Sequence, residues 1–327
     1  MKSNRRPIWL TAIAAALVAL LWGVYVIADP EKRTLDSAAR AAAPGAFASL
    51  ADGYTHYEVG GPAADAGHVV VLAAGFSVPY YIWDPTFKAL TNAGFRVLRY
   101  DYYGRGYSDR PAIPFDDEMY VRQLDQLLKE VRITEPIDLA GLSFGGSFIT
   151  SFADKYPDRV RSLIYFDPSI RRPYQLSLFE HIPFVWNYFT VLLDERFWAD
   201  DQLTDFLHPD RFPDWPARYR EQMQFKGFRQ SRLSEIASNA NVDQSDQLRR
   251  VGQHPRPVLV VWGRQDTTVP FEESEYLMSE LPQARLVAVE GSGHLPQWEQ
   301  PDIVHPELIE FLKAEGKGTA ERKGTGH

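Results

Sequence analysis

A serine in the middle of residues 137 to 146 restricts the fold of this chain more than any other feature. The segment reads Ile-Asp-Leu-Ala-Gly-Leu-Ser-Phe-Gly-Gly, an apolar strand that runs into a turn. Gly141, Ser143 and Gly145 fit the pattern G-x-S-x-G, in which a sharp strand-to-helix turn holds a serine with its hydroxyl exposed. Residues 144 to 156 then have a helical pattern that a proline ends, which is the context the motif requires. Taken alone, the segment leaves open an ordinary strand-to-helix turn of a parallel sheet.

Continuous apolar runs recur along the chain, as expected of strands that helices bury on both faces. The expected strands are residues 54–59, 68–73, 95–100, 137–142, 160–166, 257–262 and 284–289. The expected helices between them are residues 83–93, 116–131, 144–156, 271–280 and 303–314. Because strands and helices alternate, we expect an α/β fold with a doubly wound, mostly parallel sheet.

One interval breaks this alternation. From Ser169 to about Arg250 no strand-like run is present, and the segment is dense in large aromatic side chains. We expect a helical cap at residues 169–250, inserted into a core formed by residues 51–168 and 251–314. Most of these aromatics should bury the cap against the core, and some should line the cavity that the cap closes. The polar, glycine-bearing tail at residues 315–327 is expected to be disordered.

The N-terminus carries an apolar run at residues 8–27. It has the roughly 20 residues that a helix needs to cross the roughly 30 Å core of a bilayer. The basic residues Lys2, Arg5 and Arg6 precede it, so the positive-inside rule places the N-terminus in the cytoplasm and the catalytic body outside. We expect a membrane anchor at residues 1–28, followed by a polar stalk at residues 29–50. The alternatives are a cleaved signal peptide, which would leave a secreted protein, and a buried core helix.

The composition argues against several classes of function. The net charge of −8 does not suit a nucleic-acid-binding protein, which needs a basic face. The chain has no cysteine, so it has no disulfide, thiolate metal site or cysteine nucleophile. No metal-binding spacing of histidines is present, and the glycine-rich residues 101–111 lack the spacing of a phosphate-binding loop. We therefore expect no metal, no cofactor and no nucleic-acid partner.

A serine nucleophile needs a histidine base, and the base needs an acidic partner. Asp266 and His294 each follow an expected strand through a short turn. The carboxyl ends of parallel strands meet at one edge of the sheet, where Ser143 also lies. The order Ser143, Asp266, His294 is the one expected for this nucleophile turn. Asp167 also ends a strand and is the rival acid, but Pro168 follows it at the cap junction, so Asp266 is favoured.

Five stretches together resemble the α/β-hydrolase fold superfamily, over roughly residues 54 to 314. They are residues 73–76 (Ala-Ala-Gly-Phe), 101–111, 141–146, 262–266 (Trp-Gly-Arg-Gln-Asp) and 291–294 (Gly-Ser-Gly-His). The sequence is similar to the capped, single-chain lipase and esterase branch, and its N-terminal span resembles that of membrane-anchored monoacylglycerol lipases. These stretches are specific for the fold and the triad and much less specific for the substrate.

The resemblance also implies an oxyanion hole made by the backbone N–H groups of Phe76 and Phe144. One position departs from the family, which usually has His-Gly where this chain has Ala74-Gly75. The donor is a backbone amide and survives this change, but the support that the histidine gives the loop is missing. Loss of one oxyanion donor costs about 3 to 4 kcal/mol of transition-state stabilisation, so the geometry of this loop matters.

These residues predict a serine hydrolase that transfers an acyl group to water, with Ser143 as nucleophile and His294 as base. We expect a small-molecule or lipid ester with an apolar acyl chain, because the cap is rich in aromatics and the anchor would hold the site near a lipid surface. Carbon–carbon bond hydrolases and cofactor-free perhydrolases have the same triad. A non-catalytic ligand-binding receptor of this fold with a vestigial triad is a further alternative.

Overall fold

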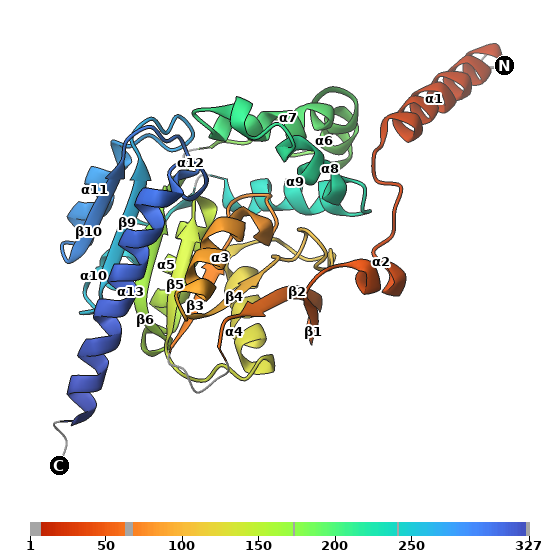
Figure 1. Ribbon diagram of the computed structural model, residues 1–327. Helices are drawn as coiled ribbons and strands as arrows, with labels where there is room; N and C mark the ends of the chain where they lie inside the picture. The colour runs from red at the N-terminus through yellow and green to blue at the C-terminus, as the bar shows by residue number, and fades with distance from the viewer. Residues whose placement is uncertain (1–7, 63–67, 173, 241, 325–327) are drawn as a thin grey trace.

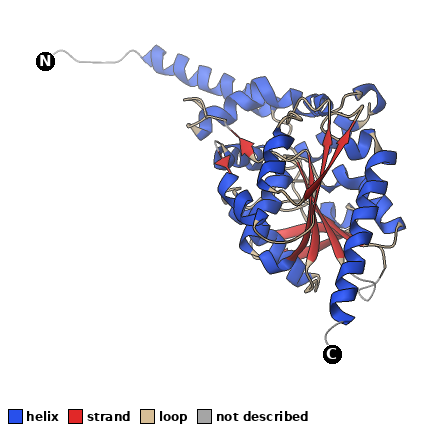
Figure 2. Ribbon diagram, turned by 90° about the vertical axis from the view of Figure 1, so that its left-hand side faces the viewer, coloured by secondary structure: helices blue, strands red, loops and turns tan. Residues whose placement is uncertain are grey.

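The computed structural model describes residues 8–62, 68–172, 174–240 and 242–324, which contain one eight-stranded sheet between layers of helices (Figures 1 and 2). Its strands are β1 (Ala46–Leu50), β2 (Gly53–Gly60), β3 (Val69–Ala73), β4 (Arg96–Tyr100), β5 (Ile137–Leu142), β6 (Val160–Phe166), β9 (Val258–Gly263) and β10 (Ala284–Val289), in the order β1-β2-β4-β3-β5-β6-β9-β10. Strand β2 is antiparallel to β1 and β4, and the other neighbours are parallel. The expectation of a mostly parallel sheet is confirmed.

Helices cover both faces of the sheet (Figure 2). One layer contains α3 (Asp84–Asn92), α12 (Pro296–Glu299) and α13 (Pro301–Gly324), and the other contains α4 (Asp117–Glu130), α5 (Phe144–Lys155), α10 (Ser245–Gly252) and α11 (Glu273–Glu280). Every residue of the central strands β3, β5 and β9 is buried. This burial explains why these strands are continuous apolar runs rather than alternating ones.

A helical cap lies above the carboxyl ends of the strands (Figure 1). It comprises α6 (Pro183–Phe189), a π-helix η4 (Thr190–Asp194), α7 (Trp198–Asp201), α8 (Trp215–Met223), α9 (Phe228–Asn239) and the short 3₁₀ turns η5 (Glu195–Phe197), η6 (Gln202–Asp205) and η7 (Pro209–Arg211). A two-stranded antiparallel pair, β7 (Arg171–Arg172) and β8 (Val242–Asp243), joins the two ends of the cap.

The C-terminal boundary of the cap differs from the expected residues 169–250. Helix α10 packs against α5 and α11 of the core and buries Leu248 and Val251 there. Gln244 also fastens this helix to the core, because its Nε2 donates hydrogen bonds to Ser151 Oγ at 2.8 Å and to Asp117 Oδ2 at 2.6 Å. The cap therefore ends near β8, before α10 begins.

The segment expected to be a stalk is part of the folded body. After α1 (Ile8–Ala28), the backbone of Arg33 exchanges hydrogen bonds with Gln224 (2.8 Å) and Lys226 (2.9 Å) of the cap. A short helix α2 (Ser37–Ala42) follows, and β1 then pairs with β2 at the edge of the sheet. Strand β1 was missed because its sequence, Ala-Phe-Ala-Ser-Leu, is short and lacks β-branched residues. Residues 1–7 of the expected anchor lie outside the described residues.

The C-terminal tail also differs from the expectation of disorder at residues 315–327. Helix α13 continues through residues 315–324, and residues 325–327 lie outside the described part of the chain. Six of the ten residues 315–324 are glutamate, lysine, alanine or arginine, which favour a helix, and each interior glycine opposes it by about 1 kcal/mol.

Candidate active site

Ser143 lies at the sharp turn between β5 and α5. Its backbone adopts φ 52° and ψ −118°, a conformation that residues with a side chain rarely adopt. The flanking glycines make this turn possible, because a Cβ on Gly141 would overlap the backbone of Gly145. A Cβ on Gly145 would overlap the carbonyl oxygens of Ala73 and Ala74. The structure therefore places Ser143 on the strand-to-helix turn that its motif predicts.

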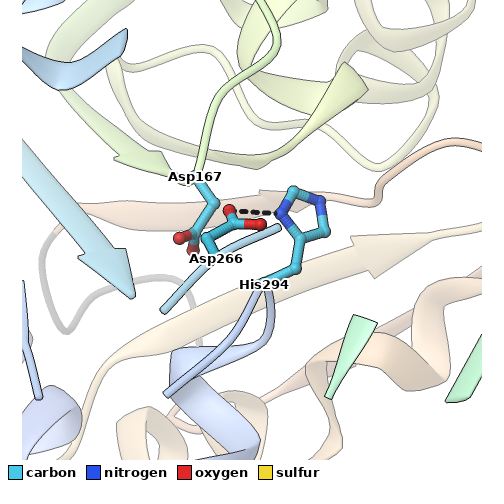
Figure 3. Close-up of side chains that lie close together, drawn as sticks. All are labelled: Asp167, Asp266 and His294. Carbon is cyan, nitrogen blue, oxygen red and sulfur yellow. Dashed lines mark hydrogen bonds and ion pairs between the residues drawn. The ribbon is translucent and has the colours of Figure 1, made fainter. Parts of the chain in front are cut away.

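His294 and Asp266 form a buried pair (Figure 3). Nδ1 of His294 lies 2.7 Å from Oδ2 of Asp266. The other carboxylate oxygen of Asp266 accepts hydrogen bonds from the backbone N–H groups of Thr268 (2.8 Å) and Val269 (2.9 Å), which fix its orientation. With the Nδ1 proton donated to the carboxylate, Nε2 of the neutral imidazole is the nitrogen that can act as a base.

Close backbone packing brings the loops of these two residues together. Gly263, at the end of β9, lies against Gly293, and a Cβ at position 263 would overlap the Gly293 carbonyl. The side chain of Gln265 accepts hydrogen bonds from the N–H groups of Gly291 (2.9 Å) and Ser292 (3.2 Å). The two loops therefore act as one unit that holds the imidazole against the carboxylate.

Ser143 and His294 line the same cavity, which has a volume of about 230 Å³. The cap contributes polar residues to its wall: Asp201, Gln202, Thr204, Asp205 and Arg232. Among the described residues no hydrogen bond joins Ser143 Oγ to His294, and such bonds often tighten only when substrate is bound. All three residues of the predicted triad thus meet at one edge of the sheet, with Asp266 in contact with His294.

The loop after β3 lies beside the nucleophile. A Cβ built on Gly75 would lie 3.6 Å from the Cβ of Ser143, so the loop passes close to the serine turn at the residue before Phe76. Tyr102 donates a hydrogen bond from its hydroxyl to the Ala74 carbonyl at 3.1 Å. Ser77, the residue after Phe76 in this loop, has a backbone φ of 61°, which is in the left-handed region.

Two cap residues hold this loop from the other side. The hydroxyl of Tyr219 donates to Ser77 Oγ at 2.8 Å, and Nε2 of Gln222 donates to the Ser77 carbonyl at 2.8 Å. Oε1 of Gln222 also accepts a hydrogen bond from the N–H of Gly106 at 3.0 Å. These contacts support the loop although a histidine is absent at Ala74. No pattern in the sequence indicates these contacts, because Tyr219 and Gln222 lie on α8, far from the loop in the chain.

Asp167 is a second buried carboxyl group beside the pair (Figure 3). Its Oδ1 accepts a hydrogen bond from the N–H of Gly263 at 2.8 Å. Burial raises the pKa of Asp167 well above its ordinary value, and the charge of Asp266 and a hydrogen bond to it act in the same direction. These surroundings favour the neutral, protonated form of Asp167 over the carboxylate. Since His294 bonds to Asp266, Asp167 does not occupy the position of the triad acid.

The same three side chains also lie close enough together to be considered as a metal site. Asp167, Asp266 and His294 each offer a possible ligand atom, and these atoms lie within 4.8 Å of one another. However, Nδ1 of His294 already bonds to Asp266, and the raised pKa of Asp167 disfavours the ionised carboxylate that a cation needs as a ligand. The arrangement fits two carboxyl groups that share a proton beside an imidazole better than it fits a metal centre.

The cap also places a charged group beside the imidazole. Asp205 accepts a hydrogen bond from the N–H of His294 at its backbone carbonyl (2.8 Å) and from the Thr268 hydroxyl at its carboxylate (2.7 Å). Burial lowers the pKa of His294, but the hydrogen bond and charge of Asp266, together with the charge of Asp205, outweigh burial and raise it. The imidazolium form of His294 is thus stabilised by two carboxylates.

A second, mostly apolar cavity of about 340 Å³ adjoins the predicted oxyanion residues. It is lined by Phe76, Phe144, Tyr174, Glu235, Ile236, Asn239 and Ala240. Phe76 lines both cavities, so the two cavities are neighbours at the loop beside the nucleophile.

Arg232 is the cationic side chain on the wall of the smaller cavity. Its guanidinium lies 4.7 Å from the centre of the Phe76 ring and 4.3 Å from that of Trp198, and it donates a hydrogen bond to the Tyr219 hydroxyl at 3.2 Å. The described part of the chain gives Arg232 no carboxylate partner. A substrate with a negative charge would supply one.

Residues 68–301 match the family model described as alpha/beta hydrolase fold. The chain belongs to this family. The matched range contains the three residues of the predicted triad and the whole cap of this α/β-hydrolase.

Proteins that are similar to this α/β-hydrolase are named for different activities. A 2-hydroxy-6-oxononadienedioate/2-hydroxy-6-oxononatrienedioate hydrolase of Cupriavidus pinatubonensis is 27% identical over 81% of this chain and 94% of its own length. A putative non-heme chloroperoxidase of Synechocystis is 25% identical over 76% of this chain and 92% of its own length. The structure of a thermophilic esterase from Thermogutta terrifontis has a TM-score of 0.69 at 24% identity, covering 84% of this chain and 100% of that chain. Family membership therefore leaves the reaction and the substrate open.

Proposed function

We propose that this α/β-hydrolase is a membrane-anchored serine hydrolase that cleaves a carboxylic ester with an apolar acyl chain. The observation that carries the proposal is that Ser143 and His294 line one cavity while His294 is paired with Asp266. A hydroxyl, an imidazole and a carboxylate in this order are the groups that activate a serine for attack on a carbonyl.

In the proposed reaction, Ser143 Oγ attacks the ester carbonyl while Nε2 of His294 accepts its proton. The backbone N–H groups of Phe76 and Phe144 stabilise the oxyanion. His294 then gives the proton to the alcohol as the carbon–oxygen bond breaks and an acyl-serine remains. Water attacks the acyl-serine by the same route and restores the free serine.

The two cavities support a division of the substrate between them. The apolar cavity beside Phe76 and Phe144 suits the acyl chain, because burying hydrocarbon there removes it from water. The smaller cavity, with Asp201, Gln202 and Arg232 on its wall, suits a polar alcohol group that can hydrogen bond.

Membrane anchoring is proposed from the exposed helix α1. Its residues Trp9–Ala28 have a mean hydropathy of 2.4, and none of this stretch is buried within the structure. The basic residues before it place the N-terminus in the cytoplasm and the catalytic domain outside. A signal sequence has the same composition. A carbonate wash separates the two possibilities, because an anchored full-length protein should stay in the membrane pellet. Release with a new N-terminus at Asp29 would show secretion instead.

Labelling with a fluorophosphonate probe tests the nucleophile and separates an enzyme from a binding protein of the same fold. The wild type should be labelled and Ser143→Ala should not. Ser279→Ala, which removes an exposed serine of the core, is the matched control and should be labelled like the wild type. A panel of p-nitrophenyl esters from acetate to palmitate then measures the preferred acyl length. The proposal would be contradicted if the wild type were neither labelled by the probe nor able to hydrolyse any of these esters.

A carbon–carbon bond hydrolase is the second candidate, and Arg232 is the observation that favours it. A guanidinium in the nucleophile cavity that has no carboxylate partner among the described residues suits a carboxylate-bearing substrate, and one relative is named as the hydrolase of such a compound. If a vinylogous diketone with a carboxylate were turned over faster than any ester, the ester proposal would fail. In that case Arg232→Gln should lower turnover of the diketone much more than turnover of a neutral ester.

A further inference from the structure

Large exposed apolar side chains are concentrated on one segment of the cap. Outside α1, the described residues expose twelve such side chains, and eight of them lie between positions 174 and 197. The eight residues, named here the cap apolar face, are Tyr174, Leu178, Phe179, Ile182, Phe184, Phe189, Leu193 and Phe197. Leu178 is 85% exposed and Phe184 is 75% exposed. An exposed apolar patch of this kind marks a contact with a partner or a membrane.

The cap apolar face adjoins the end of the helix proposed to span the membrane. The ring of Tyr188 stacks on that of Tyr25 in α1, with centroids 5.8 Å apart. The Tyr188 hydroxyl donates to the Leu21 carbonyl at 3.2 Å, and the Tyr25 hydroxyl donates to Asn187 Oδ1 at 2.9 Å. Side chains of helix α6, which carries part of the cap apolar face, therefore contact the last turns of α1, and the neighbouring η4 packs against α1 as well.

A buried polar cluster fixes this joint. Arg229 of α9 is 4% exposed and donates hydrogen bonds to Asp29 at 3.0 Å, Glu195 at 2.7 Å and the Tyr25 hydroxyl at 3.1 Å. The carboxylate of Glu31 accepts hydrogen bonds from the backbone N–H groups of Gly227 (2.8 Å) and Arg229. Because these contacts hold the end of α1 on the cap, the position of α1 in a bilayer also sets the position of the cap.

The cap apolar face continues into the site. Tyr174 is 47% exposed and also lines the apolar cavity with Phe76 and Phe144. An acyl chain in contact with the exposed side of Tyr174 can therefore enter the cavity along an apolar surface. Such a path avoids the cost of exposing the chain to water.

We propose that the cap apolar face rests on the outer surface of the bilayer that α1 spans, and that acyl chains enter the apolar cavity from the membrane past Tyr174. This inference rests on the proposed anchoring by α1 and on the proposed ester hydrolysis. The occupant is a lipid surface rather than a protein, because α1 is joined to this part of the cap and would bring it to the level of the bilayer interface.

The absence of cysteine allows a direct test on the full-length protein. Leu178→Cys, Phe184→Cys and Leu193→Cys, each carrying an environment-sensitive fluorophore, are reconstituted into phosphatidylcholine vesicles. Ser279→Cys on the core is the control. We expect the three cap probes to gain at least two-fold in emission and to be quenched by lipids with a nitroxide on the acyl chain, while the control stays unquenched. Protein that floats with the vesicles but leaves the cap probes unquenched overturns this inference and keeps the anchoring; protein that does not float overturns both.

Kinetics test the path of the substrate. Leu178→Gln and Phe184→Gln should raise the KM for a long-chain ester held in vesicles about ten-fold and leave kcat/KM for a short soluble ester within two-fold. Ile303→Gln, at an exposed apolar residue of α13, is the matched control and should change neither value. An equal loss on both esters would mean that the cap apolar face only supports the fold of the cap, and would overturn the proposal. If the wild type hydrolysed no ester at all, the proposed function would fail, whereas the fluorescence result would still stand.

Discussion

At the scale of single residues, the charge on His294 should govern the pH dependence of activity. Burial lowers its pKa, but the bond to Asp266 and the charges of Asp266 and Asp205 raise it above its ordinary value of 6.5. The base must be neutral to accept the proton of Ser143, so activity is present above this raised pKa and is lost as the pH falls through it. We expect the acidic limb of the kcat/KM profile to lie above pH 6.5.

Asp205→Asn tests the cause of this shift. The substitution removes a negative charge near the imidazole and keeps an acceptor for Thr268, so the pKa of His294 should fall and the acidic limb should move to lower pH. Asp200→Asn changes an exposed aspartate that pairs with Arg220 on the same side of the cap, and should leave the limb in place. An acidic limb that stays unchanged in Asp205→Asn would contradict the role assigned to that charge.

The raised pKa of Asp167, which favours its neutral form, leads to a second prediction. Asn is also neutral, can accept from the N–H of Gly263 and can donate to Asp266, so Asp167→Asn should keep kcat within a few-fold of the wild type. Asp266→Asn should lower kcat by about 10⁴-fold, because the partner that holds the imidazole tautomer is lost. Steady-state kinetics at neutral pH distinguish the two residues. Equal losses in both variants would make Asp167 a second essential acid.

At the scale of elements, helix α8 of the cap supports the predicted oxyanion loop. Gln222→Leu leaves the Ser77 carbonyl and the Gly106 N–H without their partner, and a shift of the loop by about 1 Å can cost about 10²-fold in rate. We expect kcat to fall by up to about 10²-fold with little change in KM. Glu221→Gln, on the same helix, changes a side chain that accepts a hydrogen bond from the half-buried Tyr107 hydroxyl, and should keep kcat. An unchanged kcat in Gln222→Leu would mean that the loop keeps its position without α8.

The elements that could be predicted from the sequence are those whose own residues carry the signal, such as a continuous apolar run or a turn motif. The turn at Ser143 has a local steric signature, and Asp266 and His294 follow strands that are apolar throughout, so their meeting at one sheet edge follows from the parallel topology. Strand β1 was missed and helix α10 was assigned to the cap, because their partners, β2 and α5, cannot be read from their own sequences. The contacts of Gln222 with the oxyanion loop depend on how the cap folds back over the core, which no local pattern encodes.

At the scale of the whole molecule, the α1 helix, the cap and the core form one connected body. The sequence predicted a spacer after α1, and the structure has instead a backbone bridge at Arg33, a buried cluster around Arg229 and an edge strand in the sheet. Charged residues after an apolar helix are usually solvated, so their burial against the cap had no signal in the sequence. A change at the joint should therefore alter the stability of the cap as well as the position of α1.

Arg229→Met tests this connection. Removing the guanidinium leaves Asp29 and Glu195 as unpaired acidic groups, and breaking a buried pair from one side costs about 3 to 5 kcal/mol. Burial already raises the pKa of Glu195 to about 7 against the opposing effect of Arg229, so in the variant Glu195 should hold its proton to still higher pH. Urea titration of the detergent-solubilised, full-length protein measures the free energy of unfolding. The control is Arg220→Met, which removes an exposed ion pair with Asp200 and should change this free energy by less than about 1 kcal/mol. Equal effects of the two substitutions would mean that the cluster around Arg229 does not join α1 to the cap in solution.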